Sequence, residues 1–442
     1  MRNATPTISD VRPRAAPQGR RATADPASVS VKRLLIIAFQ FPPFALGSGY
    51  QRSLRFVQHL PRFGWEALVL SAHPRAFEVV DDDLIEEVPR GTVVERAFAL
   101  DTARHLAIGG VYPERFARPD RNVSWYPGAV MLGRRMLRKH RPDAILSTYP
   151  IATAHMIGRT LARMSGLPWV ADFRDPMVQE GYPADPRTWA SFKRIEEGVF
   201  DLASACTFTT PSAAQMYRER YPETSARIEV IENGYDEETF ASVAPADVAA
   251  GPLNRDATTL LHSGIVYPEE RDPTQLFAAL AMLRSRGIDG RRLRVRFRAP
   301  EHDELLRDLA RRYEVESMVD VMPRVRYQEA VVEMLRADGL LVLQAANCNA
   351  QIPAKLYEYL RAGRPILALT DPAGDTAAVM CKNGVNAIAR LDNAAAIADL
   401  LARFVAGDRS GMVASSSAVS LASRSARADE LAKLLDSLAA AG

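Results

Sequence analysis

The sequence predicts an α/β protein built from two Rossmann-like domains, each with a parallel β-sheet. Short apolar runs, typical of strands buried on both faces, recur along the chain, and helical segments separate them. This alternation predicts parallel sheets covered by helices on both sides. A polar stretch rich in Ala, Pro and Asp, residues 242–256, divides the runs into two series, and 442 residues suffice for two or three domains.

The chain divides into five regions by composition. Residues 1–30 are rich in Arg, Ala, Pro, Ser and Thr, without an apolar core, so we predict a disordered tail rather than a secretory signal. Their Arg-rich, acid-poor composition also resembles that of a transit peptide. The predicted domains and connections are an N-terminal Rossmann-like domain (31–235), a linker (236–256), a C-terminal Rossmann-like domain (257–408) and a C-terminal helical segment (409–442).

The strands are expected at the apolar runs. In the first domain these are residues 33–39, 66–71, 144–147, 169–173, 205–209 and 228–231. In the second they are residues 259–262, 294–298, 318–322, 339–343, 365–369 and 386–389. Two such domains bind ligands at the carboxyl ends of their strands, so a cleft between them is the expected site.

Composition excludes several classes of protein. A formal net charge of +3 is too small to indicate nucleic-acid binding. Cys206, Cys348 and Cys381 lie far apart, without the spacing of a zinc site or a disulfide framework, so we expect no metal and a cytoplasmic location. No apolar run approaches the 18 residues that predict a membrane-spanning helix.

A glycine loop follows the first predicted strand. Gly47 and Gly49 lie where a helix begins, and backbone amides at such a place can approach an anion. The loop matches neither the GxGxxG fingerprint nor the P-loop. A plain turning loop is the alternative.

A charged cluster follows the strand at 169–173. Asp172 and Arg174 are predicted to bind sugar hydroxyls or orient a reacting group, since charges at a strand end are costly unless paired or used. The alternative is a buried ion pair between Arg174 and Asp175.

The second domain carries two further candidate groups of residues. The Gly264 amide and the Arg271 guanidinium are predicted to clamp a diphosphate, while His262 is expected to be a packed strand-end residue. Lys355 and Glu358 lie one turn apart on a helix predicted at 354–362. A lysine in a first helical turn is disfavoured by the helix dipole unless an anion binds there. This layout suits a ribose diphosphate.

Three motifs, with the order of elements, resemble those of retaining family-4 glycosyltransferases of the GT-B fold. They are the glycine loop, residues 230–236 (VIENGYD) and residues 358–366 (EYLRAGRPI). The resemblance covers about residues 33–439. It implies that Glu358 binds the ribose of a nucleotide sugar, that Arg271 and Lys355 neutralise its diphosphate, and that a helix at 425–439 returns to the first domain.

The sequence departs from the family pattern at two places. Ala350 replaces the first of two glutamates eight positions apart, and Gln351 or Asn349 is the candidate substitute. The histidine expected after the strand near residue 171 is absent, and Asp172–Asp175 occupies its place. These departures weaken the prediction of which donor binds more than they weaken the prediction of the fold.

The resemblance implies a metal-independent hexosyl transfer with retention, from a nucleoside-diphosphate sugar to a glycan or lipid-linked acceptor, as in polysaccharide biosynthesis. No cofactor beyond the donor is expected. The basic stretch 133–141 could place the protein at the inner membrane face, or be only a solvated helix face. The alternatives are a nucleotide-sugar epimerase or phosphorylase, and a non-catalytic nucleotide-binding protein.

Overall fold

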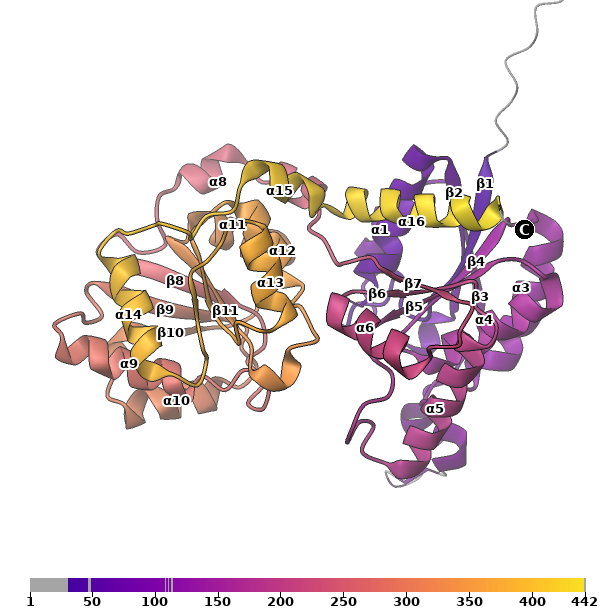
Figure 1. The fold of residues 1–442 in the computed structure, drawn as a ribbon, viewed down its shortest axis with the longest axis horizontal. Coiled ribbons are helices and arrows are strands. Elements are labelled where there is room, and N and C mark those ends of the chain that lie inside the picture. Colours follow the sequence, from indigo (N-terminus) through magenta and orange to yellow (C-terminus); the bar gives the residue numbers. More distant parts are fainter. Residues whose placement is uncertain (1–30, 47–48, 108, 110, 113, 441–442) are drawn as a thin grey trace, which may run out of the picture. The chain divides into compact units, whose positions relative to one another are not determined.

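The computed structural model describes residues 31–46, 49–107, 109, 111–112 and 114–440. In these residues the chain forms two parallel β-sheets of seven and six strands, both within the compact unit Lys32–Gly442 (Figure 1). The prediction of two Rossmann-like parallel-sheet domains is therefore confirmed. Gly47 and the predicted tail at 1–30 lie outside the described residues.

The first sheet has the strand order β3-β2-β1-β4-β5-β6-β7. Its strands are β1 (Lys32–Ile37), β2 (Trp65–Ala72), β3 (Val93–Ala97), β4 (Ala144–Thr148), β5 (Trp169–Arg174), β6 (Ala205–Phe208) and β7 (Arg227–Val230). The sequence analysis missed β3. This edge strand is only half-buried and contains Glu95 and Arg96, so it has no continuous apolar run.

The helices of the first domain follow its strands. They are α1 (Gln51–His59), α2 (Thr102–His105), α3 (Trp125–His140), α4 (Ala152–Ser165), α5 (Pro186–Phe200) and α6 (Pro211–Arg220). Short 3₁₀ helices are η1 (Leu60–Phe63), η2 (Pro74–Ala76), η3 (Asp82–Glu87) and η4 (Glu114–Ala117).

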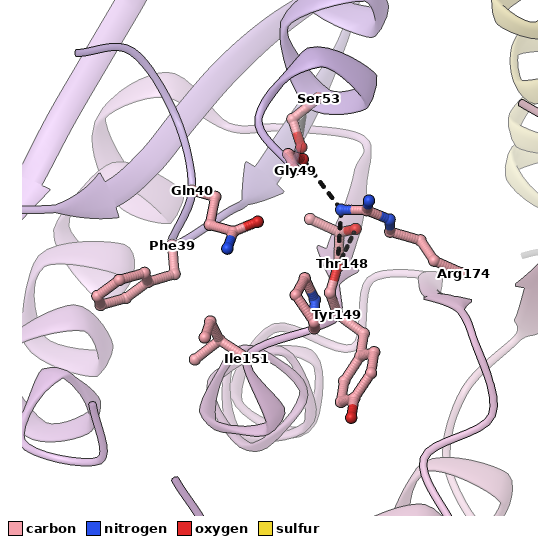
Figure 2. Close-up of a pocket in the computed structure, with 9 residues that line it drawn as sticks. Phe39, Gln40, Gly49, Ser53, Thr148, Tyr149, Ile151 and Arg174 are labelled. Carbon is pink, nitrogen blue, oxygen red and sulfur yellow. Dashed lines mark hydrogen bonds between the residues drawn. The ribbon is translucent and has the colours of Figure 1, made fainter. Parts of the chain in front are cut away.

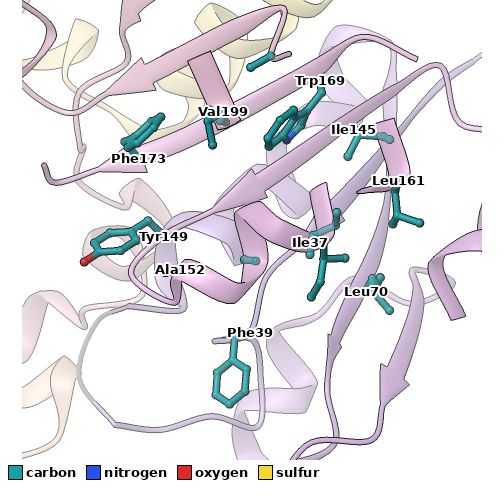
Figure 3. Close-up of a cluster of buried hydrophobic side chains, with 14 of the residues drawn as sticks. Ile37, Phe39, Leu70, Ile145, Tyr149, Ala152, Leu161, Trp169, Phe173 and Val199 are labelled. Carbon is teal, nitrogen blue, oxygen red and sulfur yellow. The ribbon is translucent and has the colours of Figure 1, made fainter. Parts of the chain in front are cut away.

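Both faces of the first sheet are buried. Along β1, Leu35 and Ile37 point into one apolar cluster, which also contains residues of α3, α4, α5 and α6 (Figure 3). Leu34 and Ile36 point to the opposite face, which α1 and the C-terminal helix cover. Each such buried side chain stabilises the fold by roughly 1.5–3 kcal/mol, which explains why the strands consist of unbroken apolar runs.

The second sheet has the order β10-β9-β8-β11-β12-β13. Its strands are β8 (Thr258–Ser263), β9 (Leu293–Arg298), β10 (Val319–Met322), β11 (Gly339–Leu343), β12 (Ile366–Leu369) and β13 (Ile388–Ala389). Its helices are α9 (Thr274–Ser285), α10 (Asp303–Arg312), η5 (Glu316–Met318), α11 (Tyr327–Arg336), η6 (Ala346–Cys348), α12 (Lys355–Ala362), α13 (Asp375–Lys382) and α14 (Ala394–Val405). In the described part of the chain, no helix is both long and apolar enough to cross a bilayer.

The segment predicted as a linker contains two short helices, α7 (Glu237–Ala241) and α8 (Pro245–Ala249). Phe240 of α7 belongs to an apolar cluster of the second domain, together with Leu340 and Leu360. This part of the predicted linker therefore contributes to the core of the second domain.

The chain returns to the first domain through α15 (Ser416–Leu421) and α16 (Arg424–Ala439). Tyr235 N donates to Ala422 O (3.1 Å), and Arg424 N donates to Tyr235 O (2.9 Å), so the outgoing and returning segments lie side by side. Leu431 and Leu435 of α16 belong to the apolar cluster of Leu34 and Ile36. The predicted return of the C-terminal helix is confirmed.

Candidate active site

An open pocket lies at the carboxyl ends of β1, β4 and β5, beside the start of α1 (Figure 2). We call it the β1–β5 pocket. It spans about 180 Å³, solvent included, and is lined by Phe39, Gln40, Gly49, Ser53, Thr148, Tyr149, Pro150, Ile151 and Arg174. The carboxyl edge of a parallel sheet is where α/β proteins bind their ligands. The predicted residues Gly49 and Arg174 meet here.

Gly49 packs closely against the side chain of Gln40 at the pocket wall. A Cβ atom at this position would lie 1.9 Å from Oε1 of Gln40. A larger residue here would therefore require the end of the Gln40 side chain to move.

Arg174 ends β5 in a strained backbone conformation. The register with β6 shifts between Asp172 and Arg174, and Arg174 has φ of +62°, a left-handed conformation that costs a residue other than glycine roughly 1–2 kcal/mol. Its Nη1 donates to Gly49 O (3.0 Å) and to Tyr149 O (3.3 Å) (Figure 2). Burial lowers the pKa of Arg174, but a guanidinium remains protonated. The strain thus places a cation on the pocket wall.

Asp172 lies beneath the pocket and does not line it. The carboxylate is 1% exposed and accepts hydrogen bonds from Arg52 Nε (3.0 Å) and Nη2 (2.9 Å). Thr148 Oγ1 and Thr207 Oγ1 also donate to it, each at 2.9 Å. Burial alone would raise the pKa of Asp172, but Arg52, Arg174 and the Thr207 hydroxyl together outweigh burial and lower the pKa. These bonds occupy both oxygens of the Asp172 carboxylate. A direct contact between Asp172 and a substrate therefore stays a prediction that this structure does not test.

Asp175 is the exposed carboxylate of this strand end. In the described residues its side chain has no ion-pair contact with Arg174, although the two charges act on each other electrostatically. The alternative of a buried Arg174–Asp175 ion pair is therefore not confirmed. The buried pair at this place joins Asp172 to Arg52 instead.

The two groups predicted to clamp a diphosphate already donate hydrogen bonds within the protein. The Gly264 amide donates to Arg298 O (3.0 Å), so that amide is already occupied. Gly264 has φ of +143°, and no atom lies within 4 Å of where its Cβ would be. Nη1 of Arg271 donates to Ile265 O (2.5 Å), and its guanidinium lies 5.3 Å from the ring centroid of Tyr267. The role of both residues toward a diphosphate stays a prediction.

His262 is a packed strand-end histidine. Its Nδ1 lies 2.9 Å from Leu341 O. Burial lowers its pKa to about 4, so the ring is neutral at pH 7. A buried neutral ring of this kind matches the structural role expected from the sequence.

Lys355, Glu358 and Tyr327 form a compact polar group at the start of α12. Lys355 Nζ donates to Glu358 Oε2 (2.8 Å), and Tyr327 OH donates to Glu358 Oε1 (2.8 Å). The lysine side chain is 35% exposed and the glutamate side chain 7% exposed. Burial and then the Glu358 charge raise the pKa of Tyr327, so its hydroxyl stays a donor. The group places one cation and one carboxylate at the same helix start.

The position of the missing family glutamate is also described. Ala350 O accepts a hydrogen bond from Thr210 Oγ1 (2.8 Å). Asn349 Nδ2 donates to Asp371 Oδ2 (2.8 Å), whereas the described hydrogen bonds of Gln351 involve only its backbone. The Gln351 side chain and the Asn349 carboxamide oxygen are therefore both without a partner in the described residues, and both stay candidate substitutes.

The sequence analysis missed four arginines, which lie in α1 and at the start of α16: Arg52, Arg55, Arg424 and Arg427. A usable signal was present, because each helix carries two arginines three residues apart and near its amino end, where cations are disfavoured. It also missed Tyr327, which has no motif of its own. In the described residues, no cluster of three His, Cys, Asp or Glu side chains could hold a metal ion.

Comparison with protein families gives a match over residues 48–234 to the model of the glycosyl transferase 4-like domain. Residues 48–234 are therefore similar to this domain. The two-domain fold is the GT-B fold of the solved structures described next, as the motifs indicated. Comparison with curated proteins finds no match.

Three solved structures show the same fold over nearly their whole length. HepE of Anabaena in complex with UDP-glucose has a TM-score of 0.63 at 14% identity, with 92% of this chain and 99% of that chain covered. Sucrose-phosphate synthase from Thermosynechococcus elongatus has a TM-score of 0.63 at 15% identity, with 93% and 100% covered. A trehalose-6-phosphate synthase studied for glycosyl transfer with retention has a TM-score of 0.63 at 12% identity, with 92% and 99% covered.

Proposed function

We propose that this protein is a glycosyltransferase that moves a hexose from a nucleoside-diphosphate sugar to a hydroxyl group of a glycan or a lipid-linked saccharide. The observation that carries the proposal is the pair of Lys355 and Glu358 at the start of α12. The complex of HepE with UDP-glucose supports a nucleotide-sugar donor by analogy of fold.

The donor would rearrange this pair on binding. A diphosphate near Lys355 replaces Glu358 as the partner of the ammonium, and the helix N-terminus favours the added negative charge. Glu358 is then free to accept hydrogen bonds from the ribose hydroxyls. Arg271 would exchange its bond to Ile265 O for a phosphate oxygen. Hydrogen bonds to charged groups contribute roughly 1.5–3 kcal/mol each, enough to drive such exchanges.

We propose transfer with retention. The acceptor oxygen forms its bond to the anomeric carbon on the side from which the diphosphate leaves, and the departing phosphate oxygen takes the hydroxyl proton. No protein nucleophile is needed in this scheme. Lys355 and Arg271 would stabilise the charge that develops on the leaving diphosphate, which assigns no task to a metal or other cofactor. The retaining trehalose-6-phosphate synthase supports this choice through its shared fold.

The β1–β5 pocket is the proposed acceptor site. Nη1 of Arg174 contacts two neutral carbonyl oxygens, so its charge can still orient an acceptor oxygen. Asp175 is exposed beside it and can accept a hydrogen bond from a sugar hydroxyl. Asp172 would act as a positioning residue, because its hydrogen bonds fix Arg52 beneath the pocket.

A basic surface on α3 supports peripheral contact with the inner membrane face. Arg134, Arg135, Arg138 and Lys139 are exposed and have no ion pair with any described residue, and α3 contains no Asp or Glu. Met131 on the same helix is 73% exposed. Such a helix face attracts anionic lipids. Sedimentation with anionic vesicles tests this, and loss of the protein from the vesicle pellet in the Arg134→Glu/Arg138→Glu variant is the expected result.

The test of the donor site is a thermal-shift screen with UDP, GDP, ADP, CDP and dTDP. One nucleotide should raise the Tm, Glu358→Ala should abolish the rise, and the exposed control Glu304→Ala should keep it. No rise with any nucleotide would refute the donor site.

A non-catalytic nucleotide-binding protein is the second candidate, because Ala350 stands where the family carries a glutamate. A turnover assay distinguishes the transferase from the non-catalytic binding protein. Release of nucleotide from a matched donor only when acceptor is added supports transfer, whereas a thermal shift without any turnover supports binding alone.

A further inference from the structure

A second pocket lies between α1, residues 232–234 and the start of α16. It is a shallow, solvent-open depression of about 220 Å³, solvent included, and is lined by Arg52, Arg55, Phe56, Glu232, Asn233, Gly234, Arg424 and Arg427. We call it the arginine pocket. Four guanidinium groups and one carboxylate line it. None of the predicted donor-site residues is in its wall.

The two arginines of α1 are fixed from behind. Arg52 is paired with Asp172, and Arg55 with Asp236 (2.9 Å) and Glu87 (3.0 Å). Both arginines are less than 9% exposed. Arg55 Nε is nevertheless buried without a hydrogen-bond partner in the described residues. A buried unpartnered donor is costly, so part of the hydrogen-bonding capacity of Arg55 remains unused.

The two arginines of α16 lie in its first turn, where the helix dipole disfavours cations. Arg427 is balanced by Glu232 (3.0 Å) and Glu430 (2.7 Å). Arg424 donates only to neutral oxygens, Gly234 O (2.9 Å) and Gln51 Oε1 (2.7 Å). Nothing described pairs Arg424 with a carboxylate at ion-pair distance. Glu358 and Asp236 act on its charge only from farther away, so Arg424 lacks a direct counterion.

The wall carboxylate is already held in place. Glu232 Oε2 accepts from Arg427 Nη2 (3.0 Å) and from Tyr357 OH (3.2 Å). It therefore balances Arg427 rather than Arg424. Arg55 is paired with two carboxylates, so the unbalanced positive charge of the pocket wall is concentrated at Arg424.

We propose that the arginine pocket binds the phosphoryl group of a second ligand, in addition to the donor nucleotide. A phosphate oxygen matches the planar donor edge of a guanidinium, and charge-assisted bonds of this kind are among the strongest hydrogen bonds in proteins. The bound phosphoryl group gives Arg424 its missing counterion and the start of α16 the negative charge that its dipole favours. The ligand would contact α1, residues 232–234 and the start of α16.

Thermal shift with inorganic phosphate tests the site, with sodium chloride of equal ionic strength as the reference. Phosphate should raise the Tm of the unaltered chain, and Arg424→Gln should weaken the apparent affinity at least tenfold. Arg424→Lys should recover part of it, and the exposed control Arg292→Gln should leave it unchanged. Glu232→Gln should strengthen binding several-fold, which keeps the test decisive if Arg424→Gln fails to fold.

Two results would overturn the proposal. One is a phosphate response no larger than that of chloride in the unaltered chain. The other is loss of the phosphate response in the presence of the nucleotide found in the donor screen, because the donor's own diphosphate then fills the pocket. A phosphate response that persists beside saturating nucleotide supports a separate ligand. If no nucleotide binds, the proposed donor site is refuted. The phosphate titration still tests, independently, whether the arginine pocket binds a phosphoryl group.

Discussion

Lys355 Nζ lies 2.8 Å from Glu358 Oε2, so the one lysine at the start of α12 is neutralised by a carboxylate three residues along the same helix. The pair is partly accessible, since a third of the lysine side chain is exposed. An incoming anion therefore competes with a carboxylate for one ammonium. The strength of this competition determines how the donor binds and how the reaction proceeds.

Lys355→Ala should reduce kcat by about 100-fold or more while changing the affinity for nucleotide much less. The ammonium stabilises charge that grows on the leaving diphosphate, and losing one such donor costs roughly 3–4 kcal/mol in a transition state. Steady-state kinetics and nucleotide titration measure the two effects. Lys382→Ala, at an exposed lysine of α13, is the control. Equal losses in turnover and binding would contradict the proposed role.

Arg174→Gln should raise the KM for the acceptor at least tenfold and leave the nucleotide thermal shift unchanged. The guanidinium borders the β1–β5 pocket, which lies in the first domain, whereas Lys355 and Glu358 belong to the second. Acceptor saturation curves give the measurement, with the exposed Arg163→Gln as control. A changed nucleotide shift with a normal acceptor KM would show that Arg174 serves the donor instead.

The stability of the chain should fall between pH 6.5 and pH 4. Burial lowers the pKa of His155 to about 4, from 6.5 when it is exposed. In this window the unfolded state binds a proton that the folded state refuses, so stability rises with pH. A shift of this size corresponds to about 3 kcal/mol.

Urea unfolding at several pH values should show a shallower pH dependence in His155→Gln than in the unaltered chain. Its buried Nδ1 lies 2.8 Å from Ser147 Oγ, so the variant will also lose stability at every pH. The test is the slope of the unfolding free energy against pH, rather than its absolute value at one pH. Identical slopes in the two proteins would rule out His155 as the titrating group.

Gly234→Ala should destabilise the chain by roughly 1–3 kcal/mol. A Cβ at this position would lie 2.7 Å from Ala422 O and 2.9 Å from Arg424 N, both backbone atoms of the returning segment. The two segments would have to separate. Chemical denaturation provides the measurement, and Ser420→Ala in the exposed part of α15 is the control. An unchanged midpoint would show that the segments can move apart freely.

The sequence predicted the fold because its strands are unbroken apolar runs, a direct consequence of burial on both faces. It failed at β3, where Glu95 and Arg96 interrupt the run at a sheet edge. It also placed Lys355 and Glu358 together, since residues three apart on a helix are neighbours. Local spacing carried this information.

Long-range pairing was beyond the sequence. Asp172 binds Arg52, which is 120 residues away in the chain, so spacing alone could not show that its carboxylate is occupied. The Gly264 amide is occupied by the carbonyl of Arg298 on the neighbouring strand, a contact set by sheet register. Which charges are already paired depends on the fold, and that decides which remain free for a ligand.

The burial of α16 against Leu34 and Ile36 has a consequence for the order of events during translation. One apolar face of the first strand is completed by Leu431 and Leu435, which the ribosome adds about 400 residues later. Until then α1 covers only part of that face, while the second domain has already been synthesised. Stalled or prematurely terminated chains should therefore be held by chaperones through the first domain, although its own strands are complete.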